Sequence, residues 1–249
     1  MDAADIFLPG ARANITVRKV PQAQAAQQLA LDIAQQLRAA IAARGRAVLS
    51  VSGGRSPVAL FEALCTQRLD WARVFVTLVD ERCLPVTHEH SNALLVSTHL
   101  LQDQAAAAHW VPMVSAHTAP LPAPEDLARQ ANAALMATGA ADVTVLGMGA
   151  DGHTASLFPD ATNLSAALDL SSPDACMAMV LPTPPANAPY ARLSQTLAQL
   201  LRSGAIVLPL AGADKLQTLV QAWATPSARM PIARLLHQTQ APVALWIST

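Results

Sequence analysis

The residues best suited to chemistry lie in one glycine-rich segment of the chain. Residues 147–153 read GMGADGH and follow an apolar run at 143–146, whose composition predicts a strand buried on both faces. Glycines at the end of a strand allow tight turns and close approach of the backbone to a ligand. Packing alone does not account for Asp151 and His153 in such a turn, and histidine exchanges protons near neutral pH, with an ordinary pKa of about 6.5. The segment therefore indicates that His153 takes part in a reaction.

A second polar cluster follows another apolar run. Residues 46–51 predict a strand, and residues 52–57 read SGGRSP ahead of a helical pattern with Pro57 near its first turn. A strand, a glycine-rich loop and a helix in this order present backbone N–H groups to an anion. The loop lacks the GK[ST] of nucleotide-binding P-loops. It therefore favours the phosphate of a small molecule, with an ordinary tight turn as the alternative.

A third cluster, the Asp-Glu-Arg of residues 80–82, comes directly after the apolar strand predicted at 74–79. Three charged residues in that place indicate either a functional cluster or a structural ion pair. The loop that follows carries His88 and His90, whose spacing could suit a metal ion. No third or fourth ligand is identifiable, so the sequence favours a solvated loop and no metal site.

A fourth cluster contains Lys215, which lies a few residues past the strand predicted at 204–210. Lys19 and Lys215 are the only lysines of the chain. A cation at the start of a helix is unfavourable because the N-terminal end of the helix dipole is positive. A bound anion would resolve the conflict, and a solvated lysine is the alternative. Arg192 could join this cluster.

The order of these patterns predicts the fold class. Strands alternate with helices throughout, which is typical of an α/β protein with a mainly parallel, Rossmann-like sheet flanked by helices. No domain boundary is evident, so residues 1–249 are expected to form a single domain. The carboxyl ends of parallel strands lie at one edge of a sheet, and ligands of open α/β sheets bind there. The four clusters are therefore expected to meet and to bind a phosphorylated small molecule.

Composition excludes several other classes of protein. The formal net charge is -1, which gives no general attraction to nucleic acid or to an anionic membrane. No apolar run approaches the roughly 18 residues that a membrane span needs. The acidic residues 1–5 do not resemble a signal peptide. The three cysteines are scattered and odd in number, which favours reduced thiols and a cytoplasmic location.

Two motif-based alternatives are weak. The glycines of residues 147–152 match the G-x-G-x-x-G of dinucleotide-binding folds, but Asp151 would place a carboxylate beside the pyrophosphate, and the motif is not in the first βα unit. A serine nucleophile is the second alternative. The chain lacks G-x-S-x-G, and Ser52 and Ser56 have the positions of ligand contacts.

Taken together, the clusters resemble the signatures of the 6-phosphogluconolactonase family. The matching segments run in order along nearly the whole chain: SGGRSP at 52–57, DER at 80–82 with Ser91-Asn92 downstream, and GMGADGHTASLFP at 147–159. The segment RLSQT at 192–196 is similar to the family's R-[IV]-T-x-T. The chain stops at Thr249, soon after Trp246, where the family usually continues, and we expect this departure to affect packing and not catalysis.

The resemblance implies hydrolysis of 6-phospho-D-glucono-1,5-lactone to 6-phospho-D-gluconate, in the oxidative pentose phosphate pathway, without metal or cofactor. His153 would act as general base on water. Asp151 or Asp80 could orient its imidazole or bind sugar hydroxyls, and Arg82 could serve phosphate, oxyanion or hydroxyls. The candidate substrate-binding residues are Gly53, Gly54, Arg55, Ser56, Arg82, Asn92, Arg192 and Lys215. The expected partner is the sugar phosphate alone, and a monomer and a homodimer both remain open.

Three rivals remain beside this interpretation. Aminosugar-phosphate deaminases share the fold and a similar glycine loop, but they typically carry a carboxylate soon after the histidine, where residues 154–158 here read TASLF. A sugar-phosphate-sensing domain of a repressor would need a DNA-binding segment, which the chain lacks. An inactive lactonase-like binder is disfavoured by the presence of both Asp151 and His153.

Overall fold

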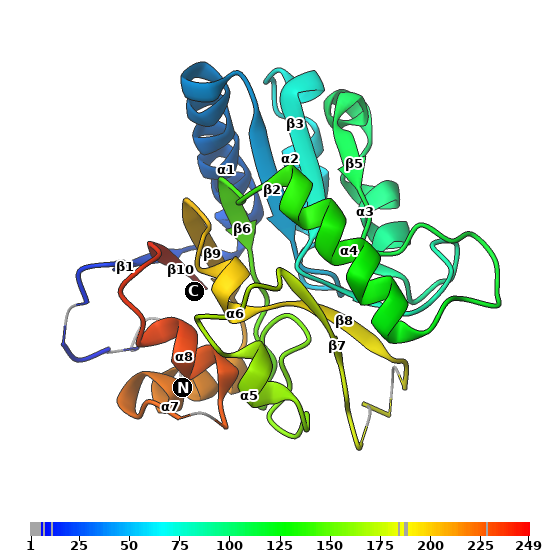
Figure 1. The fold of residues 1–249 in the computed structure, drawn as a ribbon. Helices are drawn as coiled ribbons and strands as arrows, with labels where there is room; N and C mark the ends of the chain where they lie inside the picture. Colours follow the sequence, from blue (N-terminus) through cyan, green and yellow to red (C-terminus); the bar gives the residue numbers. More distant parts are fainter. Residues whose placement is uncertain (1–5, 7, 11, 184, 187–188, 228) are drawn as a thin grey trace.

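The fold is built on a parallel β-sheet with helices on both faces, as the computed structural model shows (Figure 1). The structure describes residues 6, 8–10, 12–183, 185–186, 189–227 and 229–249, so the acidic residues 1–5 lie outside it. Within these residues, seven strands pair in the order β1-β10-β9-β6-β2-β3-β5, and every neighbouring pair is parallel. The strands are β1 (Ile15–Val20), β2 (Ala47–Val51), β3 (Val74–Leu78), β5 (His109–Val111), β6 (Val143–Val145), β9 (Ala205–Leu210) and β10 (Val243–Ser248).

The helices follow the apolar periodicity of the sequence. α1 turns Leu29, Ile33 and Leu37 towards the core and ends at Gly45, whose φ of 75° suits glycine. The other helices are α2 (Val58–Cys65), α3 (Asn92–His99), α4 (Pro124–Thr138), α5 (Leu164–Ala167), α6 (Leu197–Leu200), α7 (Ala213–Ala224) and α8 (Pro231–Leu236), with α1 spanning Gln22–Arg44 and short 3-10 helices at Trp71–Arg73 and Asp103–Ala107.

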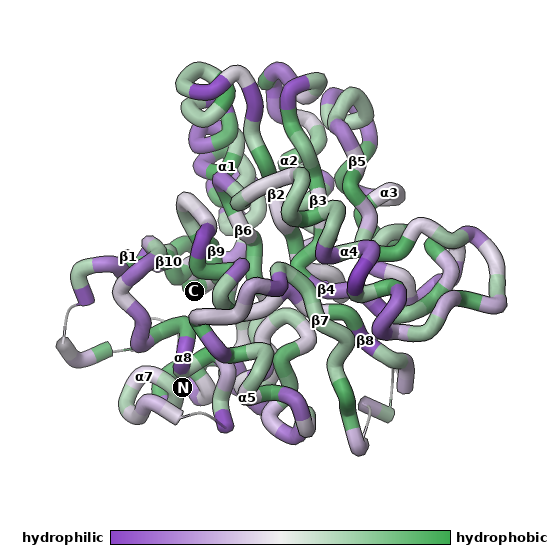
Figure 2. The backbone as a smooth tube through the Cα atoms, in the orientation of Figure 1, coloured by the Kyte–Doolittle hydropathy of each residue, from purple (hydrophilic) through white to green (hydrophobic). Residues whose placement is uncertain are grey.

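Two clusters of buried side chains pack on the two faces of the sheet. Successive residues of β9 divide between them: Val207 belongs to one cluster, while Ile206 and Leu208 belong to the other. β2 and β6 are buried along their whole length, and Figure 2 shows the central strands as predominantly hydrophobic. A strand buried on both faces reads as a continuous apolar run, which is why these strands are recognisable in the sequence.

A second sheet was not predicted. Within the described residues it has three strands in the order β4-β8-β7, namely β4 (Asp80–Arg82), β8 (Arg192–Gln195) and β7 (Cys176–Met179), and both pairings are antiparallel. No strand was expected at residues 80–82 or at residues 192–196, so β4 and β8 are additions to the predicted fold. β8 is buried although it carries polar side chains, so its sequence does not read as a buried strand. Gln195 Nε2 donates to Ser50 Oγ and to Leu78 O, and these hydrogen bonds join the small sheet to the large one.

The topology places four loops side by side. β9, β6, β2 and β3 are neighbours in the large sheet and run parallel. Their carboxyl ends therefore lead into the four polar clusters at one edge of the sheet, as predicted. Among the described residues, no helix is long and apolar enough to cross a membrane.

Candidate active site

A pocket of about 270 Å³ opens where the four loops meet, close to the lower end of the roughly 300–1,000 Å³ range of small-ligand sites. Nine of the residues predicted for the site line it: Gly53, Gly54, Ser56, Asp80, Arg82, Asn92, His153, Arg192 and Lys215. Two predicted residues do not. Arg55 is exposed outside the pocket lining, and Asp151 lies beside His153.

His153 contacts a carboxylate through one of its two ring nitrogens. Its Nδ1 lies 2.5 Å from Asp151 Oδ1, and the same oxygen accepts from the His153 backbone N–H at 3.1 Å. Partial burial alone would raise the pKa of Asp151, but the hydrogen bonds and the charge of His153 outweigh it, so the pKa of Asp151 is lowered. An ionised Asp151 favours the neutral tautomer of the imidazole that carries its proton on Nδ1. Nε2 is then left with a lone pair, as a general base requires.

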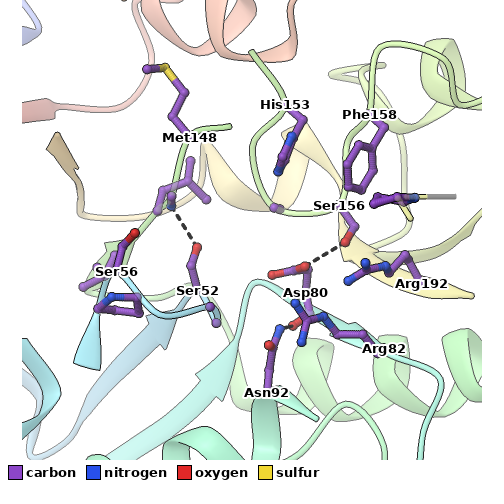
Figure 3. Close-up of a pocket in the computed structure, with 18 of the residues that line it drawn as sticks. Ser52, Ser56, Asp80, Arg82, Asn92, Met148, His153, Ser156, Phe158 and Arg192 are labelled. Atoms are coloured by element: carbon purple, nitrogen blue, oxygen red, sulfur yellow. Dashed lines mark hydrogen bonds between the residues drawn. The ribbon is translucent and has the colours of Figure 1, made fainter. Parts of the chain in front are cut away.

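Two further groups lie against the same imidazole. The ring of Phe158 stacks on that of His153, with centroids 4.3 Å apart and an interplanar angle of 28°. A Cβ built on Gly149 would lie 2.2 Å from both Cε1 and Nδ1 of His153. The backbone of Gly149 therefore approaches the imidazole closely, and so does the ring of Phe158 (Figure 3).

Asp80 is held by the small sheet and by a serine of the glycine-rich segment. Ser156 Oγ donates to Asp80 Oδ2 at 2.7 Å, and the Ser156 N–H donates to Ser194 Oγ of β8. Ser156 and Ser194 are fully buried, and both Asp80 and Ser156 line the pocket. Asp80 can therefore accept hydrogen bonds from ligand hydroxyls, while Asp151 is the carboxylate in contact with His153.

Two arginines form a cationic wall. Arg82 of β4 and Arg192 of β8 are directly paired across the antiparallel ladder, and both line the pocket. Burial, and next the charge of Arg82, lowers the pKa of Arg192. Arg82 donates through NH1 to His90 O, whereas its buried Nε has no hydrogen-bond partner among the described residues. Like charges directly opposite each other are unfavourable, so this wall suits an anion.

A third cation reaches the pocket from another loop. Lys215 Nζ lies 3.4 Å from Ser56 Oγ of the SGGRSP loop, and burial lowers the pKa of Lys215. Lys215 lies in the first turn of α7, as the sequence predicted. Ser56, Lys215 and the backbone of the loop can together donate to an anionic ligand.

Close approaches of the backbone hold the loops together. A Cβ on Gly53 would lie 1.9 Å from Asn92 Oδ1, so only glycine leaves room for the Asn92 amide, whose Nδ2 donates to Asp80 O. Ser52 Oγ accepts from the Gly147 N–H at 2.9 Å, which joins the anion-type loop to the histidine segment (Figure 3). These contacts therefore fix the positions of the loops that follow different strands relative to one another.

Glu81, between Asp80 and Arg82, faces away from the pocket. Its carboxylate is fully buried and accepts from the N–H groups of Arg82, Asn92 and Ala93 and from Ser91 Oγ. Three of these donors belong to the N-terminal turn of α3, where a negative charge is favourable. Burial raises the pKa of Glu81 to about 7, against the opposing effect of the four hydrogen bonds.

Sequence reasoning missed several contributors. Ser156 and Phe158 belong to the TASLFP segment but carried no assigned role, and Glu81 was grouped with its charged neighbours. Hydroxyl and aromatic side chains next to a catalytic-type histidine are the signal that could have found the first two.

His88 and His90 have ring centroids 5.6 Å apart, with Tyr190 at the same distance from each. No cluster of three or more His, Cys, Asp or Glu suited to a metal ion occurs among the described residues.

Fold and site together define an α/β protein with a small pocket, lined in part by cationic side chains, at the carboxyl edge of its sheet. The chain matches the family described as glucosamine-6-phosphate isomerases/6-phosphogluconolactonase over residues 21–246. It is 44% identical to the 6-phosphogluconolactonase of Pseudomonas putida over 242 residues, which cover 95% of this chain and 94% of the relative. The 6-phosphogluconolactonase of Rhizobium meliloti (strain 1021) is 42% identical over 237 residues, 94% of this chain and 98% of the relative.

A solved structure agrees with these relatives. A 6-phosphogluconolactonase from Shewanella baltica OS155 superposes with a TM-score of 0.87 at 35% identity, covering 96% of this chain and all of that chain (100%). The chain therefore belongs to the glucosamine-6-phosphate isomerase/6-phosphogluconolactonase family. The resemblance read from its motifs and the predicted α/β class are both confirmed.

Proposed function

We propose that this chain hydrolyses 6-phospho-D-glucono-1,5-lactone to 6-phospho-D-gluconate, the lactone step of the oxidative pentose phosphate pathway, with His153 as general base. The observation that carries the mechanism is the contact of Asp151 Oδ1 with His153 Nδ1, in a pocket that also contains cations and hydroxyl-binding groups. The lactonase names of relatives 42–44% identical to the chain support the choice of reaction.

The chemistry requires one base and good positioning. His153 Nε2 takes a proton from water as the water oxygen bonds to the lactone carbonyl carbon, and the carbonyl electrons move to its oxygen. When this oxyanion collapses, the bond from carbon to ring oxygen breaks, and His153 returns the proton to the departing ring oxygen. The acid so formed loses its own proton to solvent. Asp151 stabilises the imidazolium between the two steps.

The cationic groups suit the two anionic parts of the substrate, the phosphate and the developing oxyanion. Gly53, Gly54, Arg55, Ser56, Arg192 and Lys215 are the proposed phosphate ligands, although Arg55 would have to turn inward from its exposed position. Arg82 pairs with Arg192 and can serve either group. Asp80 and Asn92 are proposed to bind the sugar hydroxyls.

The segment after His153 favours hydrolysis over deamination. Thr154 Oγ1 donates to Gly147 O and Ser156 Oγ donates to Asp80, so these side chains brace the loop and the pocket. The segment TASLF supplies no carboxylate for sugar ring opening. Release of ammonia from glucosamine 6-phosphate would support the deaminase instead.

His153→Ala tests the proposal. We expect kcat for the lactone to fall by about 10²–10⁴-fold, the usual contribution of a general base, with little change in affinity for 6-phosphogluconate. Lactone disappearance should be followed with correction for spontaneous hydrolysis. His117→Ala, at an exposed histidine outside the pocket lining, is the matched control. Near-wild-type turnover of His153→Ala would refute the base assignment, and tight product binding by a wild-type chain without turnover would indicate an inactive binder.

The remaining assignments follow from this reaction. We propose that it needs neither a metal nor a cofactor, as the resemblance of the motifs implies, and that no nucleic acid or membrane takes part. The three cysteines, Cys65, Cys83 and Cys176, are free thiols, which supports a cytoplasmic location.

A further inference from the structure

Three groups lie close to the imidazole of His153: a carboxylate, an aromatic ring and a segment of backbone. Asp151 fixes one ring nitrogen at 2.5 Å. Phe158 covers a ring face, and Gly149 approaches the ring edge that carries Cε1 and Nδ1. The following inference rests on the proposed role of His153 and concerns what these two neighbours do for it.

Phe158 stacks on the imidazole in a position set by the rest of the fold. The centroid distance of 4.3 Å and the angle of 28° describe a stacked pair, a favourable arrangement of aromatic rings. Phe158 is 8% exposed and packs in the same buried cluster as Leu157 and Leu197. The guanidinium carbon of Arg192 lies 6.0 Å from the Phe158 ring centroid. The phenyl ring thus lies near both His153 and Arg192 of the cationic wall (Figure 3).

Because Gly149 has no side chain, its backbone can lie close to the imidazole and limit the movement of the ring. Its φ lies outside the left-handed region, so the backbone conformation itself would accept alanine. The obstacle is steric: a Cβ would lie 2.2 Å from Cε1 and Nδ1 of His153 and 2.6 Å from Asp151 Oδ1. These atoms are side-chain ends, so an added methyl group would displace the imidazole and the carboxylate while the backbone stayed in place.

We propose that Gly149 and Phe158 are positioning residues that hold the His153 imidazole in the orientation that presents Nε2 to the water that attacks the lactone carbonyl. Asp151 alone leaves the ring free to rotate about the Nδ1 contact. A stacked ring on one face and the loop backbone of Gly149 at the Nδ1–Cε1 edge remove that freedom. Preorganisation of this kind acts on the chemical step, because a misplacement of about 1 Å of a reacting group can cost about 10²-fold in rate.

Gly149→Ala and Phe158→Leu test the proposal in the full chain. For Gly149→Ala we expect kcat to fall by about 10²-fold, with KM and the affinity for 6-phosphogluconate little changed. Phe158→Leu keeps an apolar side chain in the buried cluster and should lower kcat by about 2- to 10-fold, the equivalent of one aromatic pair. Ile33→Val, in the buried face of α1 away from the pocket, controls for a small loss of stability and should leave kcat unchanged.

Combination with His153→Ala separates positioning from a general structural role. Because both residues act through the imidazole, Gly149→Ala and Phe158→Leu should not lower the residual activity of His153→Ala any further. A further tenfold loss in that background, or a rise in KM with unchanged kcat, would overturn the proposal. Unchanged kcat of the folded single variants would overturn it too. If a thermal melt shows that Gly149→Ala is unfolded, the kcat of Phe158→Leu decides whether the proposal holds. Wild-type turnover by His153→Ala would instead refute the proposed base.

Discussion

Replacing Glu81 by glutamine should change how the stability of the protein depends on pH. Glu81 is fully buried, and its four hydrogen-bond donors come from Arg82 and from residues 91–93. Burial raises its pKa from an ordinary value of 4.5 to about 7 in the folded protein. The folded state therefore holds a proton that the unfolded state has lost between these two pH values.

The sign and size of the effect follow from this difference. A raised pKa contributes stability that is present below pH 4.5 and is lost as pH rises through about 7. Each pKa unit is worth about 1.4 kcal/mol, so the whole change amounts to about 3 kcal/mol, of which roughly 2.5 kcal/mol falls between about pH 5 and 8. Glutamine does not titrate. The free energy of unfolding of wild type should therefore decline by about that amount relative to Glu81→Gln over this range.

Urea unfolding of both proteins at several pH values from about 5 to 8 measures the difference. Other titrating groups, including the seven histidines, contribute to both proteins and cancel in the comparison. Additivity of this kind holds for groups that do not contact the substituted residue. A difference that is independent of pH, or one that changes in favour of wild type as pH rises, would refute the assignment of a raised pKa to Glu81.

Three further substitutions test contacts around the pocket. Gly53→Ala should raise KM, because a Cβ there would lie 1.9 Å from Asn92 Oδ1; unchanged steady-state kinetics would contradict the close approach. Ser156→Ala removes a donor 2.7 Å from buried Asp80 and should lower the free energy of unfolding by about 1.5–3 kcal/mol; urea unfolding that matches wild type would count against this network. Lys215→Met should weaken 6-phosphogluconate binding by at least about tenfold, or 1.4 kcal/mol, measured by calorimetry. An unchanged Kd would remove Lys215 from the proposed phosphate ligands.

The large sheet could be predicted because its strands are buried on both faces. β2, β6 and β9 read as predominantly apolar runs, and the periodic Leu29, Ile33 and Leu37 mark α1. The small sheet could not be predicted in this way. Its strand β8 carries Ser194 and Gln195, which are buried only because Ser50, Leu78 and Ser156 supply their hydrogen bonds. Those partners come from other parts of the chain and are not apparent from local pattern.

The site was predictable as far as its polar groups follow strands. The four clusters meet because their strands are adjacent and parallel, a consequence of topology that the βα alternation implies. Which side chains of a cluster face the pocket was not predictable. Glu81 faces α3 while its neighbour Arg82 faces the pocket, and Arg55 is exposed beside pocket-lining Gly54. The orientation of each side chain depends on small turns that the sequence does not specify.

The pairing of β1 has a consequence for the order of folding during synthesis. Among the described residues, β1 pairs with β10 alone, and residues 15–20 lie opposite residues 243–248. During synthesis β1 therefore has no strand to pair with until β10, more than 200 residues later, has been made. Contacts between such distant segments form late because closing a long loop costs entropy. The central strands can accordingly pair with one another before β10 and β1 join the sheet.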